Sequence, residues 1–476
     1  MRMDKLMYIK GSWTGENLEK TEVMNPATGE RIGSIPRGGR KETAIAIQAA
    51  HDAFEEWSNL NAYDRASYLE KLYELMMKNA DRMAELMTLE MGKPLAESKG
   101  EVQYAASFIK WYAEEAKRVY GRTIPAQADN KRMMVVKQPV GVVGAITSWN
   151  FPAAMITRKL GPALAAGCTF ILKPPNQTPL TAIMLVELCE EAGIPKGVVN
   201  LVSGNSAEIG DELLNNPLVR KITFTGSTEV GRELIKKGAE QVKKMSLELG
   251  GHAPIIIMDD ADIEKAVNGV IASKFRNGGQ TCICGNRIYV QEDIHDEFVV
   301  KFAEAASKLN VGNGFDEEIN IGPVIDKPGY EKIEEHVKNA VQHGAKVVLG
   351  GNGKTENNTY FYQPTIITDV TPDMLIMHEE TFGPVAPIQK VKTEQEAIRL
   401  ANDTEFGLAA YVFTENYSRG IRIAERLQYG IIGWNDGVPS AAQAPFGGMK
   451  QSGVGREGGI EGLEAYLETK YISIGL

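Results

Sequence analysis

The sequence predicts an α/β fold in which doubly wound parallel sheets form two domains. From Val140 onward, β-type segments alternate with helical ones, and about four strand–helix units occupy the next hundred residues, a pattern typical of a parallel sheet with helices on both faces. The alternation starts afresh after Gly250 and continues to Trp434, which indicates a second α/β domain. A chain of 476 residues also exceeds one ordinary core, so at least two lobes are expected.

Hydrophobic periodicity and turn residues predict the individual elements in order. A turn is expected at 24–29, followed by helices over 41–57, 64–91 and 96–120, with a break at Gly92 and Pro94. We interpret this opening third as helical scaffold without chemistry. Extended segments are predicted at 133–140 and 465–476, strands at 142–147, 170–173, 198–202, 221–225, 255–258 and 288–290, and helices that end near 166, 192, 215, 237 and 275.

The composition is that of a globular protein and argues against several functional classes. The apolar fraction is 43% and the charged fraction 24%, and no apolar run reaches the roughly 18 residues that suggest a membrane span. A net charge of -10 without a basic stripe argues against nucleic acid as a partner. Four cysteines in so long a chain are not a disulfide framework, so we expect a cytoplasmic protein. The six histidines show no zinc-ligand spacing, and no metal site is expected.

The stretch K-F-R-N-G-G-Q-T-C-I-C-G-N-R, residues 274–287, places Cys282 on a loop between a predicted helix and a predicted strand. Loops on rigid flanks often carry nucleophiles, because their backbone can be aimed at a substrate. A lone cysteine is otherwise more often a small buried thiol. The neighbouring motifs therefore decide how Cys282 is interpreted.

Four further motifs accompany this stretch: T-S-W-N-F-P at 147–152, L-E-L-G-G-H-A-P at 247–254, E-E-T-F-G-P at 379–384 and P-F-G-G-M-K-Q-S-G at 445–453. In this order and at these separations, the five resemble the aldehyde dehydrogenase superfamily nearly end to end. The resemblance implies an NAD(P)-binding domain at 1–120 and 140–249, a catalytic domain at 250–450 and a small β oligomerisation arm at 121–139 and 458–476. It therefore implies a homodimer or homotetramer, in which the arms cover strand edges of a neighbouring subunit.

The resemblance also implies roles for three catalytic residues. Cys282 as thiolate attacks the aldehyde, and the Asn150 side chain together with the Cys282 backbone N–H binds the oxyanion that forms. Glu248 activates water to hydrolyse the thioester, and its presence favours water over coenzyme A as acyl acceptor. Without the resemblance, Asn150 would be read as a turn residue and Glu248 as a solvated residue at the end of a strand.

The cofactor signals differ from the usual dinucleotide fingerprint, because no G-x-G-x-x-G joins a strand to a helix. Instead, F-T-G-S-T-E-V-G at 224–231 runs from a strand into a helix, so Gly226 and Ser227 are suited to a pyrophosphate. An ordinary helix cap at Ser227 explains the same residues. The remaining cofactor contacts that the resemblance implies are Trp149, Lys173, Glu380 and Phe382.

Asn176 departs from the family pattern and concerns the choice of cofactor. Members that use only NAD tend to carry a glutamate at this position, three residues after Lys173. A carboxylate repels a 2′-phosphate, whereas an asparagine beside a lysine does not. We therefore expect NADP to be accepted alongside NAD.

Arg158, Arg276 and Ser440 indicate a substrate with a carboxylate at its far end. Most arginines are solvated surface charges, but two near active-site elements can clamp a carboxylate. In the succinate-semialdehyde branch of the superfamily, the matching positions hold the substrate carboxylate. A glutarate semialdehyde or a short hydroxyaldehyde stays open as a substrate, as do an uncharged aldehyde and a catalytically silent dinucleotide-binding protein.

Cys284 lies two residues after Cys282, and the sequence leaves two interpretations of it open. It is either a small buried strand residue or a resolving thiol that forms a reversible disulfide with an oxidised Cys282.

Overall fold

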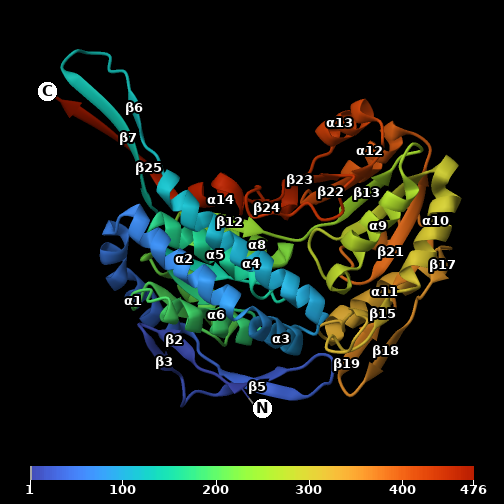
Figure 1. Ribbon diagram of the computed structural model, residues 1–476, viewed down its shortest axis with the longest axis horizontal. Coiled ribbons are helices and arrows are strands. Elements are labelled where there is room, and N and C mark those ends of the chain that lie inside the picture. Colours follow the sequence, from blue (N-terminus) through green and yellow to red (C-terminus); the bar gives the residue numbers. More distant parts are fainter. Residues whose placement is uncertain (1–2) are drawn as a thin grey trace.

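Residues 3–476 are described in a computed structural model, which contains two large parallel sheets and a smaller antiparallel one (Figure 1). Helices cover both faces of each large sheet, so the predicted doubly wound α/β fold is confirmed. None of the helices within 3–476 is long and apolar enough to cross a membrane.

The first large sheet has eight strands, of which the central five are parallel. In spatial order the strands are β24 (Gly453–Val454), β12 (Lys244–Glu248), β11 (Val219–Thr225), β8 (Val142–Ile146), β9 (Thr169–Lys173), β10 (Val199–Leu201), β2 (Met7–Ile9) and β3 (Ser12–Thr14). From β8 the chain proceeds outward through β9 and β10, then returns to the other side of β8 with β11 and β12. The sheet order therefore reverses between β8 and β11, and such a switch point opens a crevice at the carboxyl ends of the strands.

Helices pack on both faces of this sheet because its strands bury alternate residues on opposite sides. One face carries α1 (Arg40–Asn59), α7 (Ser206–Asn215) and α8 (Thr228–Ala239). The other carries α2 (Ala62–Lys78), α3 (Ala80–Met91), α4 (Leu95–Glu115), α5 (Ala154–Ala166) and α6 (Pro179–Glu191). The predicted helix 64–91 is wrong in one respect: it is two helices, because the backbone leaves the helical region at Asn79 (ψ 16°).

The second large sheet has seven strands, and all but β17 are parallel. In spatial order they are β17 (Lys346–Leu349), β20 (Thr365–Thr368), β21 (Val385–Val391), β14 (Gly285–Gln291), β13 (Ala253–Ile257), β22 (Ala409–Phe413) and β23 (Ile431–Trp434). One face packs on α9 (Ile263–Lys274) and α10 (Glu292–Ala306), the other on α11 (Lys327–Gln342), α12 (Glu394–Asn402) and α13 (Tyr417–Arg426).

The smaller antiparallel sheet projects from the body of the molecule (Figure 1) and contains β6 (Arg122–Ile124), β7 (Lys131–Pro139) and β25 (Leu467–Gly475). β25 pairs with β7 along its whole length, as the two predicted extended segments require. The short helix α14 (Gly459–Glu464) lies inside the segment 458–476 that we assigned to the arm. It packs against α4 and α5 and does not extend the arm's sheet.

The remaining elements are short. They are β1 (Met3–Asp4), β4 (Lys20–Met24), β5 (Arg31–Pro36), β15 (Asn310–Val311), β16 (Ile319–Ile321), β18 (Gly353–Glu356), β19 (Thr359–Tyr362) and the 3₁₀ turns η1 (Ala116–Arg118), η2 (Arg276–Gly279), η3 (Leu375–Met377) and η4 (Lys450–Ser452).

Candidate active site

Cys282 lies in a tight loop between η2 and β14, close to the position predicted for it. Residues 277–279 have φ angles of 53°, 62° and 75°, a region that favours glycine and, among other residues, asparagine. The loop is also packed closely against other segments. A Cβ on Gly279 would lie 2.1 Å from a backbone oxygen of the loop before β21, and one on Gly251 would lie 2.3 Å from the Cys282 carbonyl oxygen. Glycines are therefore required where the Cys282 loop meets its neighbours.

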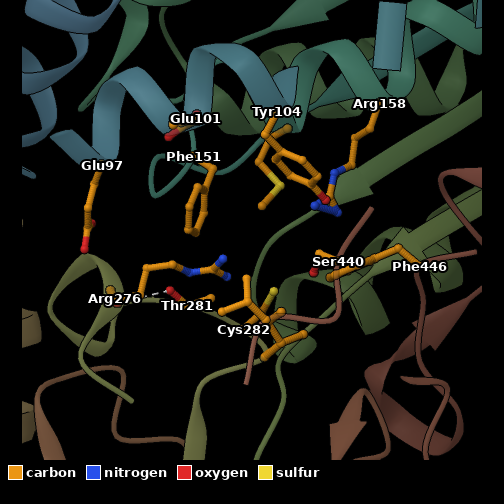
Figure 2. Close-up of a pocket in the computed structure, with 14 residues that line it drawn as sticks. Glu97, Glu101, Tyr104, Phe151, Arg158, Arg276, Thr281, Cys282, Ser440 and Phe446 are labelled. Atoms are coloured by element: carbon orange, nitrogen blue, oxygen red, sulfur yellow. Dashed lines mark hydrogen bonds between the residues drawn. The ribbon is translucent and has the colours of Figure 1, made fainter. Parts of the chain in front are cut away.

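Two cavities meet at Cys282. The larger, of about 310 Å³, is drawn in Figure 2, and the smaller has a volume of about 230 Å³. Among residues 3–476, only Cys282 and Met155 line both of them. The thiol can therefore meet one molecule in the larger cavity and another in the smaller.

The smaller cavity lies at the switch point of the first sheet. The loop after β8 contributes Trp149 and Asn150, and the turn from β11 into α8 contributes Gly226 and Ser227. The second lobe contributes Glu380 and Phe382, which precede β21. The carboxyl edge of one parallel sheet thus faces the amino edge of the other across this cavity. With Cys282, seven of the residues predicted for cofactor binding or catalysis are brought together here.

Backbone amides and aromatic side chains around the smaller cavity suit part of a dinucleotide. Ser227 caps α8 by accepting a hydrogen bond from the Val230 N–H at 3.4 Å, and the remaining amides of this helix start attract anions such as phosphate. Trp149 and Phe382 meet edge to face, with ring centroids 5.6 Å apart. Glu380 accepts a hydrogen bond from the Gly251 N–H at 3.2 Å, and burial raises its pKa to about 8.

Lys173 and Asn176, also predicted to bind the cofactor, lie outside the residues that line this cavity. Lys173 ends β9, and burial lowers its pKa to about 8. The Asn176 side-chain amide donates to the Gly204 carbonyl at 3.2 Å, whereas its buried side-chain oxygen has no hydrogen-bond partner among residues 3–476. The structure thus places both residues at the end of β9, next to the switch-point strand β8.

Asn150 is fixed by hydrogen bonds on both sides of its amide. Its nitrogen donates to the Gln280 carbonyl at 3.0 Å, and its oxygen accepts from the Ser148 hydroxyl at 2.8 Å. The amide therefore points toward the loop that carries Cys282. One N–H of the amide is left for a ligand, because the nitrogen carries two.

The resting thiol of Cys282 is protonated at neutral pH. Burial raises its pKa to about 12, the nearby Arg158 and Arg276 lower it, and Glu380 and Glu248 raise it further. A thiolate is a far stronger nucleophile than a thiol, so the attack predicted for Cys282 requires that its thiol first lose a proton.

Glu248 ends β12 and is fully buried, outside the lining of both cavities. One of its carboxylate oxygens has no hydrogen-bond partner among residues 3–476. Burial raises its pKa well above the usual range, and the neighbouring Glu457 raises it further. Because Glu248 lines neither cavity, its carboxyl group must move toward one of them to act as the predicted base. The swing that the sequence suggested for Glu248 stays a prediction.

The larger cavity is rich in buried donors that lack an acceptor (Figure 2). The atoms without a hydrogen-bond partner among residues 3–476 are the Tyr104 hydroxyl, the Arg158 Nε and Nη1, the Arg276 Nε and the Ser440 hydroxyl. All of these residues line the same cavity. Buried polar groups are nearly always satisfied in folded proteins, so this set indicates a ligand that accepts several hydrogen bonds.

The two arginines differ in how their charge is balanced. The Arg158 Nη1 lies 3.3 Å from a carboxylate oxygen of Glu457, and its guanidinium lies 4.3 Å from the centroid of the Phe446 ring. Arg276 lies over Phe151, with 5.4 Å between the guanidinium and the ring centroid, and forms no ion pair with a described carboxylate. Arg276 is therefore the cation of this cavity whose charge is least compensated.

Sequence reasoning missed the contribution of the α3–α4 region to this site, because we expected no chemistry there. In the break between these helices, the Lys93 ammonium donates to Glu101 at 2.6 Å and to the Asn150 carbonyl at 2.8 Å. The second Glu101 oxygen accepts from the Ala153 and Ala154 N–H groups at the start of α5. This network holds the Asn150 loop. The signal available in the sequence was the spacing of Glu97, Glu101 and Tyr104, which places three polar side chains on one face of α4.

Glu457 was also missed. It lies beyond the last family motif and pairs with both Arg158 and the fully buried Lys159. Lys159 donates in addition to the Thr225 hydroxyl at 2.6 Å. These buried charges connect the floor of the larger cavity with the region around Glu248.

Cys284 lies outside the lining of both cavities and is fully buried. Its sulfur accepts from the Lys274 ammonium at 3.2 Å, and that ammonium also donates to Asn286 at 2.9 Å. All four cysteines are free. The disulfide with Cys282 stays a prediction, and it requires Cys284 to leave this buried cluster.

Cys282 therefore lies between a cavity at the switch point of a parallel sheet and a second cavity rich in buried hydrogen-bond donors, an arrangement that suits a dehydrogenase with a cysteine in its active site. Residues 13–472 match the aldehyde dehydrogenase family, and the chain belongs to that family. The membership predicted from the five motifs is confirmed, and NADP or NAD as cofactor agrees with it.

The chain is similar to semialdehyde dehydrogenases over nearly its whole length. It is 55% identical to the NADP(+) succinate-semialdehyde dehydrogenase of Escherichia coli (strain K12), covering 98% of this chain and 97% of that protein. It is 54% identical, with the same coverage, to the glutarate-semialdehyde dehydrogenase of Pseudomonas aeruginosa. A solved structure of an E. coli NADP-dependent enzyme superposes with a TM-score of 0.98 at 54% identity, covering 99% of this chain and 98% of that one.

Proposed function

We propose that the protein oxidises succinic semialdehyde, or a close carboxylate-bearing aldehyde such as glutaric semialdehyde, to the dicarboxylic acid. The observation that carries this proposal is a set of buried donor atoms on Tyr104, Arg158, Arg276 and Ser440 that have no hydrogen-bond partner among residues 3–476 and that a substrate carboxylate would satisfy. The similar relatives, which are named for succinate and glutarate semialdehydes, support this substrate class.

In the proposed reaction, the arginines hold the carboxylate in the larger cavity and present the aldehyde carbon to Cys282. The thiol gives up its proton to water, and its sulfur bonds to this carbon while the C=O π electrons move onto the oxygen. The free N–H of the Asn150 amide donates to this oxygen as it becomes negative. Trp149, Ser227 and Phe382 would hold NADP or NAD at the smaller cavity, and the bound cofactor would supply a hydride acceptor beside Cys282. Glu248 then takes a proton from water, which hydrolyses the thioester and releases the acid.

Arg276 offers the sharpest test of the carboxylate clamp. Replacing it by methionine should lower kcat/KM for succinic semialdehyde by a factor that corresponds to about 2–4 kcal/mol of transition-state stabilisation. The reason is that the substrate carboxylate loses the arginine whose charge no carboxylate of the protein balances. Butyraldehyde has the same chain length and no carboxylate, so its kcat/KM should fall far less. Steady-state assays of reduced cofactor with both aldehydes measure the difference.

Arg118→Met is a matched control, because Arg118 pairs with Glu115 beyond the end of α4 and does not line the cavity. It should change neither substrate's kinetics. Arg158 is a less suitable target, since its removal also leaves the buried Glu457 with one partner fewer. Equal losses on both aldehydes in Arg276→Met would show that Arg276 has only a structural role.

We also propose that NADP is accepted alongside NAD, because Asn176 offers an amide where a carboxylate would repel a 2′-phosphate. Asn176→Glu should raise the Kd for NADP about tenfold or more while sparing that for NAD. Asn176→Gln is the matched control, since it has the length of glutamate without the charge. Fluorescence titration of both cofactors measures the ratio, and an unchanged ratio in Asn176→Glu would place the adenosine ribose elsewhere.

A homodimer or homotetramer in the cytoplasm completes the proposal. β25 and β7 form a long projecting ribbon, and Tyr471 and Ile474 of β25 are exposed on it. Such a ribbon can be covered by a neighbouring subunit.

A further inference from the structure

Helix α4 lines the larger cavity with one face, and that face lacks a side chain at one position. Glu97, Glu101 and Tyr104 project from it toward the cavity (Figure 2). Gly100 lies on the same face and also lines the cavity. A Cβ built on Gly100 meets nothing within 4 Å.

Gly100 has no structural reason to be glycine. Glycine weakens the interior of a helix, because it loses more conformational freedom on folding than any other residue. Most glycines inside helices of this protein are explained by close packing, because a Cβ would lie 2.0 to 3.0 Å from a neighbouring side chain; these are Gly161, Gly231, Gly238, Gly269, Gly420 and Gly462. Gly100 and Gly210 are the two that meet nothing within 4 Å. Of these, only Gly100 lines the cavity.

Gly100 also lies at the mouth of the cavity. Of the fourteen residues that line it, only Gly100 and Val438 are exposed, and Val438 is 43% exposed. One side of the opening is therefore formed by a backbone without a side chain. The other is formed by a small apolar residue of the loop that carries Ser440.

The cavity is larger than a four-carbon substrate needs. Its volume of about 310 Å³ falls at the lower end of the range for pockets that hold drug-sized ligands. A substrate whose aldehyde carbon reaches Cys282 therefore leaves unfilled space on the side of the mouth.

We propose that Gly100 is a specificity-determining residue that keeps this mouth open to aldehydes longer than four or five carbons. The inference rests on the proposed aldehyde oxidation and extends it to a wider range of chain lengths. A side chain at position 100 closes part of the mouth, so long aldehydes lose binding and short ones lose far less.

The test compares wild type with Gly100→Leu across propanal, butyraldehyde, hexanal and octanal, together with succinic and glutaric semialdehydes. We expect the wild type to oxidise hexanal and octanal, and Gly100→Leu to lower their kcat/KM about tenfold or more relative to propanal. A wild type inactive on the long aldehydes, or a variant that keeps the wild-type dependence on length, would overturn the proposal.

Gly210→Ala is the matched control, because Gly210 lies inside α7 and away from both cavities. Gly100→Ala and Gly210→Ala should each raise the midpoint of thermal unfolding by about 1–2 °C, since both sites accept a Cβ without strain. Only the Gly100 variants should change the dependence on chain length. A Gly210→Ala variant that changes it as strongly would refute the role of the mouth.

The four uncharged aldehydes separate the dependence of kcat/KM on chain length from the effect of the carboxylate clamp. Whether wild type prefers succinic semialdehyde over butyraldehyde tests the proposed substrate. The length dependence among uncharged aldehydes tests Gly100, whichever way that preference falls.

Discussion

Replacing Cys282 by alanine is expected to lower aldehyde oxidation by about 10⁴-fold or more, the largest effect of any single change considered. The reason is that Cys282 and Met155 alone line both cavities, and the thioether of Met155 cannot form the adduct. Cofactor binding should persist, because the other residues around the smaller cavity are unchanged. Rate assays together with fluorescence titration of NADP or NAD separate the two properties.

Cys284→Ala is the control for this experiment. Cys284 is a second buried cysteine two residues away, and it lines neither cavity. It should therefore keep most of the activity. A Cys282→Ala variant with appreciable turnover, or a Cys284→Ala variant that is equally inactive, would contradict the assignment of the nucleophile.

Glu248→Gln is expected to stop the reaction after the first turnover, with steady-state rates lowered by about 10²- to 10⁴-fold. The amide has nearly the shape of the buried carboxyl group but cannot take a proton from water. Reduced cofactor should appear as a burst of about one equivalent per active site, because the steps before hydrolysis do not need the base. Stopped-flow absorbance measures the burst.

Hydroxylamine provides an independent check on the trapped species. It attacks thioesters without a general base, so it should restore turnover to Glu248→Gln and leave Cys282→Ala inactive. A Glu248→Gln variant that turns over at the wild-type rate would show that another group activates the water. A variant without a burst would show that Glu248 acts earlier in the reaction.

Much of the fold was predictable because the relevant signals are local. The alternation of strands and helices from Val140 onward reflects side-chain periodicity within each segment, and periodicity does not depend on distant residues. The break at Asn79 was missed for the complementary reason. No glycine or proline marks it, so helical periodicity continues across the position where the backbone turns.

The motif residues were predictable for a similar reason. Asn150, Glu248 and Cys282 lie in short stretches in which a turn or a glycine pair accompanies the reactive group. The order of these stretches along the chain identified the family. It could not tell how far each side chain lies from the others, which depends on how the two sheets face one another.

The sequence by itself therefore determined the α/β class, the family and the identity of the loop that carries Cys282. Only the tertiary structure revealed that Lys93 and Glu101 hold the Asn150 loop and that Glu457 balances Arg158. It also revealed that burial raises the pKa values of both Cys282 and Glu248. Charge balance and desolvation are sums over all neighbouring groups in space, and many of those neighbours lie more than a hundred residues away along the chain.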